Sequence, residues 1–145
     1  MAGTQTLTII KPDAFESGKA GKILAHLEAE GFAIRAARVL RLTRAQAEAF
    51  YEVHRERPFF NSLVEFMTSG RCMPLILERE DAVATLRRVI GATDPAEAKP
   101  GTIRALYAES KERNAIHASD SPENATREAS FFFALADVLE TAGPA

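Results

Sequence analysis

The residues best suited to chemistry stand in one short run, Asn114-Ala115-Ile116-His117-Ala118-Ser119-Asp120-Ser121. In this run a histidine follows a short β-like pair and precedes a patch of hydroxyl and carboxylate groups. Imidazole has an unperturbed pKa of about 6.5, so it stays largely neutral yet basic near pH 7 and can attack phosphorus without a separate base. The run therefore predicts either a presented histidine nucleophile, His117, or a polar loop that precedes a helix.

A helix is predicted after this run, from Ser121 to about Phe133, because serine is a favourable N-cap and Pro122 suits the first helical position. The helical spacing places four side chains on one stripe: Ala125, Glu128, Ala129 and Phe132. Glu128 should therefore point inward, where an unpaired carboxylate is destabilising. Two partners are open from the sequence: the ring N–H of His117, whose tautomer the bond would fix, and an arginine.

Four strands and several helices are predicted to position these residues. Apolar and β-branched runs predict strands over Thr4–Ile10, Phe32–Leu42, Met73–Leu77 and Ala115–His117. Helices are predicted over Lys19–Glu30, from the capping box at Thr43 through His54, after Pro58 and over Asp81–Ile90, with an irregular segment at 93–113 and a frayed tail at 141–145. Because Asn-Gly hairpin turns are absent, helices must cover at least one face of the sheet. The chain is predicted to form a ferredoxin-like α/β sandwich.

Composition limits the class of protein. The chain has 145 residues, 46% of them hydrophobic, and its single cysteine, Cys72, excludes an intrachain disulfide. These values suit one domain over residues 1–145 in a reducing compartment. The net charge of −2 argues against nucleic acid or a membrane as the primary partner. With no apolar segment behind a basic N-terminus and no run near the roughly 18 apolar residues of a membrane span, a cytoplasmic location is expected.

Neither of two standard phosphate-binding loops occurs, since both G-x-x-x-x-G-K-[S/T] and G-x-G-x-x-G are absent. Residues 18–22 contain two glycines and two lysines, but their spacing is wrong and they are predicted as the solvated start of a helix. Side chains would therefore have to hold any bound phosphate. Taken singly, Lys11 fits a solvated strand end, Arg87 a surface helix charge, and Arg104 a salt bridge to Glu109.

Six motifs, taken together, are far more specific. They are Ile9-Ile10-Lys11-Pro12-Asp13-Ala14, His54-Arg55-Glu56-Arg57-Pro58-Phe59-Phe60, Gly91-Ala92-Thr93-Asp94-Pro95, Pro100-Gly101-Thr102-Ile103-Arg104, Asn114 to Ser121, and Arg127-Glu128. In this order and at these intervals they resemble the motifs of the nucleoside diphosphate kinase family over nearly the whole chain. The resemblance implies a four-stranded antiparallel sheet covered by helices. It also implies ping-pong transfer of the terminal phosphate of a nucleoside triphosphate to a nucleoside diphosphate through phosphorylated His117.

The resemblance assigns expected roles to further side chains. It implies that Arg87 and Thr93 hold the inner phosphates, while Arg104 and Lys11 reach the phosphoryl group in transit. Arginine suits this task because it binds phosphate bidentately and keeps its charge. Tyr51, which could otherwise be a core residue, becomes a hydrogen-bonding neighbour of the histidine.

The nucleoside also has expected contacts. Phe59 follows a proline and would be exposed in an ordinary loop, so it is a plausible platform for stacking any base. The resemblance assigns the ribose hydroxyl to Asn114 with Lys11 and a supporting place to Ser119. His26 and His54 match no catalytic position of the family. Mg²⁺ is expected as the cofactor, held mainly by the nucleotide's phosphates rather than by protein ligands.

The chain departs from the family pattern at a few positions. Ala118 stands where the family usually has glycine, Leu106-Tyr107 replaces Asp-Phe, and Lys111 lies near the usual apolar partner of the base platform. The last change is expected to leave the base more exposed. The Phe131-Phe132-Phe133 run is expected to bury part of its surface against another subunit, and the short C-terminal tail favours a tetramer among the family's dimers, tetramers and hexamers.

Two other classes of protein compete with this interpretation. A metal-dependent hydrolase would use His117, Asp120 and Glu128, but the chain has only three histidines and no pair at ligand spacing. A catalytically silent nucleotide-binding scaffold of the same fold would need none of the histidine, tyrosine, arginines and glutamate that this chain keeps. Because each of these classes meets an objection, the kinase is the favoured hypothesis.

Overall fold

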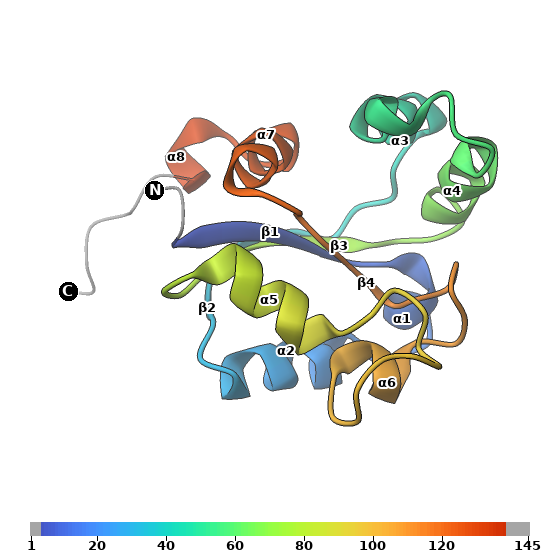
Figure 1. Cartoon of the computed structure of the whole chain (residues 1–145). Helices are drawn as coiled ribbons and strands as arrows, with labels where there is room; N and C mark the ends of the chain where they lie inside the picture. The colour runs from blue at the N-terminus through green and yellow to red at the C-terminus, as the bar shows by residue number, and fades with distance from the viewer. Residues whose placement is uncertain (1–3, 139–145) are drawn as a thin grey trace.

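The computed structural model describes residues 4–138, in which helices cover both faces of one antiparallel sheet (Figure 1). The strands are β1 (Gln5–Ile10), β2 (Ala33–Ala37), β3 (Met73–Glu78) and β4 (Ile116–Ala118), in the spatial order β2-β3-β1-β4. All three pairings are antiparallel. The structure therefore confirms the predicted ferredoxin-like sandwich.

The helices form two layers. They are α1 (Pro12–Glu16), α2 (Ala20–Ala29), α3 (Arg44–Phe50), α4 (Phe60–Met67), α5 (Ala82–Ile90), α6 (Ile103–Tyr107), α7 (Pro122–Phe132) and α8 (Leu135–Val138), with a 3-10 turn η1 at Glu52–His54. Figure 1 shows α3, α4 and α7 on one side of the sheet and α2, α5 and α6 on the other. Within residues 4–138, no helix has the length and apolar character needed to cross a membrane.

Two hydrophobic cores follow from the alternation of side chains along the central strands. On β1, Leu7 and Ile9 pack into the core under α3, α4 and α7, whereas Ile10 packs into the core under α2 and α5. On β3, Ile76 and Leu75 divide in the same way. Because successive side chains of a strand point to opposite faces, a strand buried on both faces needs an apolar run rather than an alternating pattern.

Local sequence signals fix several helix starts as predicted. At the capping box, Thr43 Oγ1 accepts a hydrogen bond from the Gln46 amide at 3.1 Å, and the Gln46 side chain accepts one from the Thr43 amide at 2.9 Å. Ser121 Oγ accepts a bond from the Asn124 amide at 3.1 Å, so α7 begins at Pro122. Each bond satisfies an amide that has no partner inside the helix.

Other elements differ from the prediction. The strand expected over Phe32–Leu42 is shorter, because the register of β2 shifts between Ile34 and Ala36 and, beyond Ala37, Leu40 makes an isolated bridge to Cys72. The segment 93–113 is not wholly irregular, since Thr102 caps the short helix α6. Neither α1 nor α8, which have five and four residues, is among the helices predicted from the sequence.

Most of the Phe131-Phe132-Phe133 run is buried within the chain itself. Phe132 and Phe133 are 4% and 8% exposed within the chain itself, and Phe131 is the member that stays accessible, at 38%. Phe131 is therefore the ring of this run that is available for burial against another subunit, and that association stays a prediction. The predicted tail at 141–145 lies outside the described residues.

A close contact joins the end of α5 to the start of α6. Gly91 has φ +89°, and a Cβ at this position would lie 2.8 Å from the Thr102 Cβ. The Gly91 carbonyl also accepts a hydrogen bond from Arg104 Nη1 at 3.1 Å. Glycine is required here both for the left-handed backbone and for the approach of Thr102.

We predict that Gly91→Ala destabilises the fold more than Gly101→Ala does. Both residues have positive φ, +89° and +88°, so each substitution costs about 1–2 kcal/mol of backbone strain. A Cβ at Gly101 meets nothing within 4 Å, whereas the one at Gly91 collides with Thr102 and adds about 1–3 kcal/mol. Urea unfolding of the two variants measures the difference, and equal midpoints would contradict the packing argument.

Candidate active site

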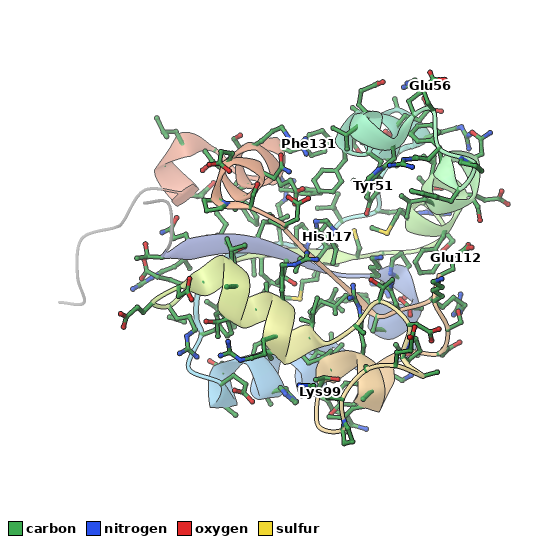
Figure 2. The ribbon with its side chains drawn as sticks, in the orientation of Figure 1. Tyr51, Glu56, Lys99, Glu112, His117 and Phe131 are labelled. Atoms are coloured by element: carbon green, nitrogen blue, oxygen red, sulfur yellow. The ribbon has the colours of Figure 1, made fainter. Side chains whose placement is uncertain are left out.

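The catalytic candidate His117 is the middle residue of the edge strand β4. It pairs with Ile9 of β1, and Thr8 Oγ1 donates a hydrogen bond to the His117 carbonyl at 2.7 Å. Its neighbours Ile116 and Ala118 pack into the core under α2 and α5, so the imidazole points to the opposite face, toward α3 and α7. The ring packs edge-on against Phe50 of α3 and lies edge-on to Tyr51, which Figure 2 labels together with His117. The strand therefore presents one ring at a fixed height above the sheet.

A buried carboxylate orients the imidazole. His117 Nε2 lies 2.7 Å from Glu128 Oε1, and Ser119 Oγ donates to the same oxygen at 2.7 Å. Arg127 Nη2 lies 3.5 Å from the other oxygen, Oε2. The predicted inward position of Glu128 is confirmed, and both partners left open by the sequence contact it. In the part of the chain that the structure describes, no hydrogen bond engages His117 Nδ1.

The carboxylate stays ionised despite its burial. Burial by itself raises the pKa of Glu128, but the hydrogen bond and charge of His117, with Ser119 and Arg127, outweigh it, so the pKa is lowered overall. An ionised Glu128 can only accept a hydrogen bond, so Nε2 carries the ring proton and donates it. The free lone pair of the ring is then on Nδ1. The arrangement thus selects the tautomer with a nucleophilic Nδ1.

Tyr51 lies beside the imidazole with an unused hydroxyl. Its ring centroid is 6.4 Å from that of His117, with the planes at 89°, and the phenol is 5% exposed. Its hydroxyl has no hydrogen-bond partner in the described part of the chain. Burial, followed by the charge of Glu128, raises the pKa of Tyr51, so the group remains a proton donor at every physiological pH.

A buried lysine directly follows β1, two residues after Ile9, which pairs with His117. Lys11 is 7% exposed, and its Nζ donates to Asn114 Oδ1 at 2.9 Å. The Asn114 amide nitrogen in turn donates to the Lys111 carbonyl at 3.0 Å. Burial, and then the nearby charge of Arg104, lower the pKa of Lys11 to about 8. The expectation of a solvated strand end is therefore wrong for this residue.

Arg104 is anchored by backbone oxygens rather than by a carboxylate. Its guanidinium donates to the carbonyls of Asn114, Gly91 and Ile116 at 3.3, 3.1 and 2.7 Å. Glu109, its alternative partner, instead pairs with Arg113 at 3.0 Å. Burial and the charge of Arg87 lower the pKa of Arg104 to about 10, which leaves it charged near neutral pH.

Arg104 borders a pocket of about 400 Å³ between α5 and α6. Its lining includes the three predicted phosphate ligands Arg87, Thr93 and Arg104. It also includes Arg88 and Lys99, which the sequence did not single out. In sequence these two are an exposed helix residue and a loop residue, and only the fold of 91–102 brings them together. The concentration of positive charge suits a polyphosphate.

The predicted base platform is exposed at the start of α4. Phe59 is 48% exposed, as expected, and its ring centroid lies 5.4 Å from that of His54. The His54 ring stacks on Tyr51 at 6.4 Å with an interplanar angle of 27°. The sequence placed His54 at the end of a predicted helix and at no catalytic position. The structure shows that it links the exposed ring to the ring beside His117.

The hydrolase alternative lacks the geometry for a metal centre. Asp120 is bonded to the Asn124 side chain at 2.6 Å, whereas Glu128 faces the histidine. Within residues 4–138, no three His, Cys, Asp or Glu side chains are grouped closely enough to hold a metal ion. The three residues of that alternative therefore do not form one ligand set.

Comparison with known proteins agrees with this geometry. The family model described as nucleoside diphosphate kinase matches residues 4–138. A nucleoside diphosphate kinase of Chlorobium chlorochromatii is 54% identical over 137 residues, which cover 94% of this chain and 98% of that protein. One of Sorangium cellulosum is 54% identical over 142 residues, covering 98% and 99%.

Solved structures give the same result. A crystal structure of the Aquifex aeolicus nucleoside diphosphate kinase is 50% identical, with a TM-score of 0.90, and the match covers 92% of this chain and 97% of that one. A structure from Encephalitozoon cuniculi is 34% identical with a TM-score of 0.90, covering 96% and 94%. The likeness extends over sequence, fold and nearly the full length of each relative. This chain therefore belongs to the nucleoside diphosphate kinase family.

Proposed function

We propose that this chain is a nucleoside diphosphate kinase that works through a phosphohistidine at His117. The observation that carries the proposal is the bond from Nε2 to the buried Glu128, which leaves Nδ1 free as the nucleophile. In the first half-reaction Nδ1 bonds to the terminal phosphorus of a nucleoside triphosphate, the bridging P–O bond breaks, and the diphosphate leaves with that oxygen. In the second, the terminal oxygen of another diphosphate attacks the same phosphorus and frees the imidazole.

Glu128 supports this step by its charge. When Nδ1 forms the bond to phosphorus, the imidazole becomes cationic, and the ionised carboxylate 2.7 Å from Nε2 stabilises that charge. Ser119 holds the same carboxylate oxygen in place at 2.7 Å. Glu128 and Ser119 thus act on the ring from the side opposite the phosphate.

The pocket between α5 and α6 would hold the phosphates. Arg87 and Thr93 would bind the inner groups, and Arg104 and Lys11 the group in transit. The last two are buried cations: Arg104 lies on α6 and bonds to the Ile116 carbonyl of β4, and Lys11 directly follows β1. The free Tyr51 hydroxyl would donate a further hydrogen bond to the group in transit. Fixed donors of this kind catalyse phosphoryl transfer by alignment and charge stabilisation.

The nucleoside would lie between Phe59 and the Lys11–Asn114 pair. Stacking on Phe59 needs only a π-face, so the site would accept every base, and the paired lysine and amide would contact the ribose hydroxyl.

Mg²⁺ would accompany the nucleotide as the cofactor. The pocket side chains are mainly cationic, and the described residues form no metal-binding group, so the donor set fits an ion carried by the phosphates. Glu97 is the acidic side chain that lines the pocket. Asp120 lies near enough that the bond from Asn124, and to a smaller extent the charge of Arg87, lower its pKa against the effect of burial. The bound ion would neutralise phosphate charge.

The remaining proposals concern the state of the protein. We propose one domain over residues 1–145, a cytoplasmic location and a homo-oligomer, with a tetramer favoured over a dimer or hexamer. The unpaired edge of β2 and the exposed Ile34, Val39 and Leu135 support association. The scaffold alternative is disfavoured, because a protein that only binds nucleotide has no use for a buried carboxylate aligned on a histidine.

We predict that His117→Ala abolishes acid-labile labelling of the protein by γ-labelled ATP. His26→Ala is the matched control, since His26 lies on α2 with Glu30 at 3.9 Å, outside the site, and should be labelled as the wild type is. Circular dichroism checks that both variants fold. Labelling of His117→Ala at the wild-type rate would remove it as the nucleophile.

We predict that Glu128→Gln lowers the rate of phosphorylation by ATP by about 10- to 1,000-fold, with nucleotide affinity nearly unchanged. The amide keeps the shape of the carboxylate but loses its charge. Glu123→Gln makes the same change at an exposed position of α7 and should have no effect. Rapid-quench phosphorylation and thermal unfolding are measured together. Early melting with normal phosphorylation would show that Glu128 only stabilises the helix.

We predict that kcat/KM falls as pH rises through about 8, roughly tenfold per pH unit, because the free enzyme loses the Lys11 charge there. Bound phosphates favour the charged lysine, so the fall in kcat should lie at higher pH. Lys11→Arg keeps its charge and should lack this alkaline limb. Cys72, whose pKa burial raises to about 11, does not titrate in this range. A wild-type kcat/KM that is flat to pH 9.5 would contradict the prediction.

A further inference from the structure

The loop that precedes β4 is closed by its own hydrogen bonds. The Glu109 amide donates to the Arg113 carbonyl at 2.9 Å, and the Arg113 amide donates to Ser110 Oγ at 3.0 Å. The Arg113 and Glu109 side chains pair at 3.0 Å, and the Asn114 amide nitrogen donates to the Lys111 carbonyl at 3.0 Å. These bonds hold the loop that carries Glu112 without the help of a ligand.

The loop also lies along one face of α4. Ser62 Oγ donates to Glu112 Oε1 at 2.9 Å, and the Arg113 guanidinium stacks on the Phe66 ring at 5.7 Å. Ser62 and Phe66 are one turn apart, and Phe59 stands one turn before Ser62, so all three lie on one face of the helix. The carboxylate of Glu112 is therefore held about one helical turn from the base platform. Figure 2 shows Glu112 below α4, toward α1.

The same carboxylate is close to the ribose end of the site. Burial and Arg104 lower the pKa of Lys11 to about 8, and the charges of Asp13 and Glu112 act against them. A nucleoside that spans from Phe59 to Lys11 and Asn114 must pass this carboxylate. Apart from the Ser62 bond, no hydrogen bond or ion pair engages Glu112 within residues 4–138, so Oε2 is available as an acceptor.

We propose that Glu112 is a base-specificity residue, whose carboxylate accepts hydrogen bonds from the 2-amino group and N1–H of guanine. The proposal rests on the proposed function, because it takes the nucleoside position from that site. Guanine is the base that offers two adjacent donors to a carboxylate, and bonds to a charged acceptor are stronger than neutral ones. Stacking on Phe59 allows every base to bind, and Glu112 then raises the affinity for guanine above that for the other bases.

Removal of one group from the base isolates this contact. Hypoxanthine keeps the purine ring and N1–H of guanine but lacks the 2-amino group, so GDP and IDP differ only there. We expect the wild type to bind GDP about 5- to 20-fold more tightly than IDP, and Glu112→Ala to reduce that ratio to about 1–2. Ser62→Ala, which frees the carboxylate, should give an intermediate ratio. Glu65→Ala removes an equal charge from the next turn of α4 and should keep the wild-type ratio.

Calorimetric titration of the unphosphorylated protein with GDP, IDP and dGDP measures these ratios without any phosphoryl transfer. The rates at which the same diphosphates discharge the phosphoenzyme should follow the same order. A wild-type GDP to IDP ratio below 2, or a ratio that Glu112→Ala leaves intact, would overturn the proposal. So would a Glu112→Ala variant that changes only the GDP to dGDP ratio, because the carboxylate would then contact the ribose. A protein that shows the GDP preference but forms no phosphoenzyme would overturn the proposed function alone.

Discussion

The site depends on one buried ion, the carboxylate of Glu128. A carboxylate that is 6% exposed is stable only when its oxygens are paired, and here His117, Ser119 and Arg127 share that task. The pairing fixes the imidazole, and the requirement for it fixes the packing of α7 over β1 and β4. The same contact therefore joins α7 to β4 and engages Nε2 of the ring rather than Nδ1.

Positive charge is buried in the candidate site, although the chain as a whole has a negative net charge. The protein carries a net charge of −2, yet Lys11 and Arg104 are each less than a tenth exposed. Their lowered pKa values show that burial disfavours both charges in the free protein. A polyanion bound as proposed above would relieve that penalty, and backbone carbonyls and an amide side chain already hold both cations in place.

Local chemistry accounts for what the sequence predicted well. The caps at Thr43 and Ser121, the apolar runs of β1 and β3, and the inward stripe that places Glu128 depend on neighbours a few residues away. The partners of Arg104 could not be predicted in this way, because its three carbonyls lie 10 to 13 residues from it and meet only when α5, α6 and β4 pack. The place of His54 between Phe59 and Tyr51 likewise needs the turn η1, which interrupts the single helix predicted from Thr43 through His54.

The buried position of Cys72 has a practical consequence. This cysteine lies just before β3, fully buried and bridged through its backbone to Leu40, and burial raises the pKa of its thiol to about 11. Thiolate is the form that reacts with oxidants and alkylating reagents, so the native sulfur is protected both by its burial and by its protonation. A cysteine introduced on the surface can therefore carry a fluorophore or a spin label without prior removal of the native one.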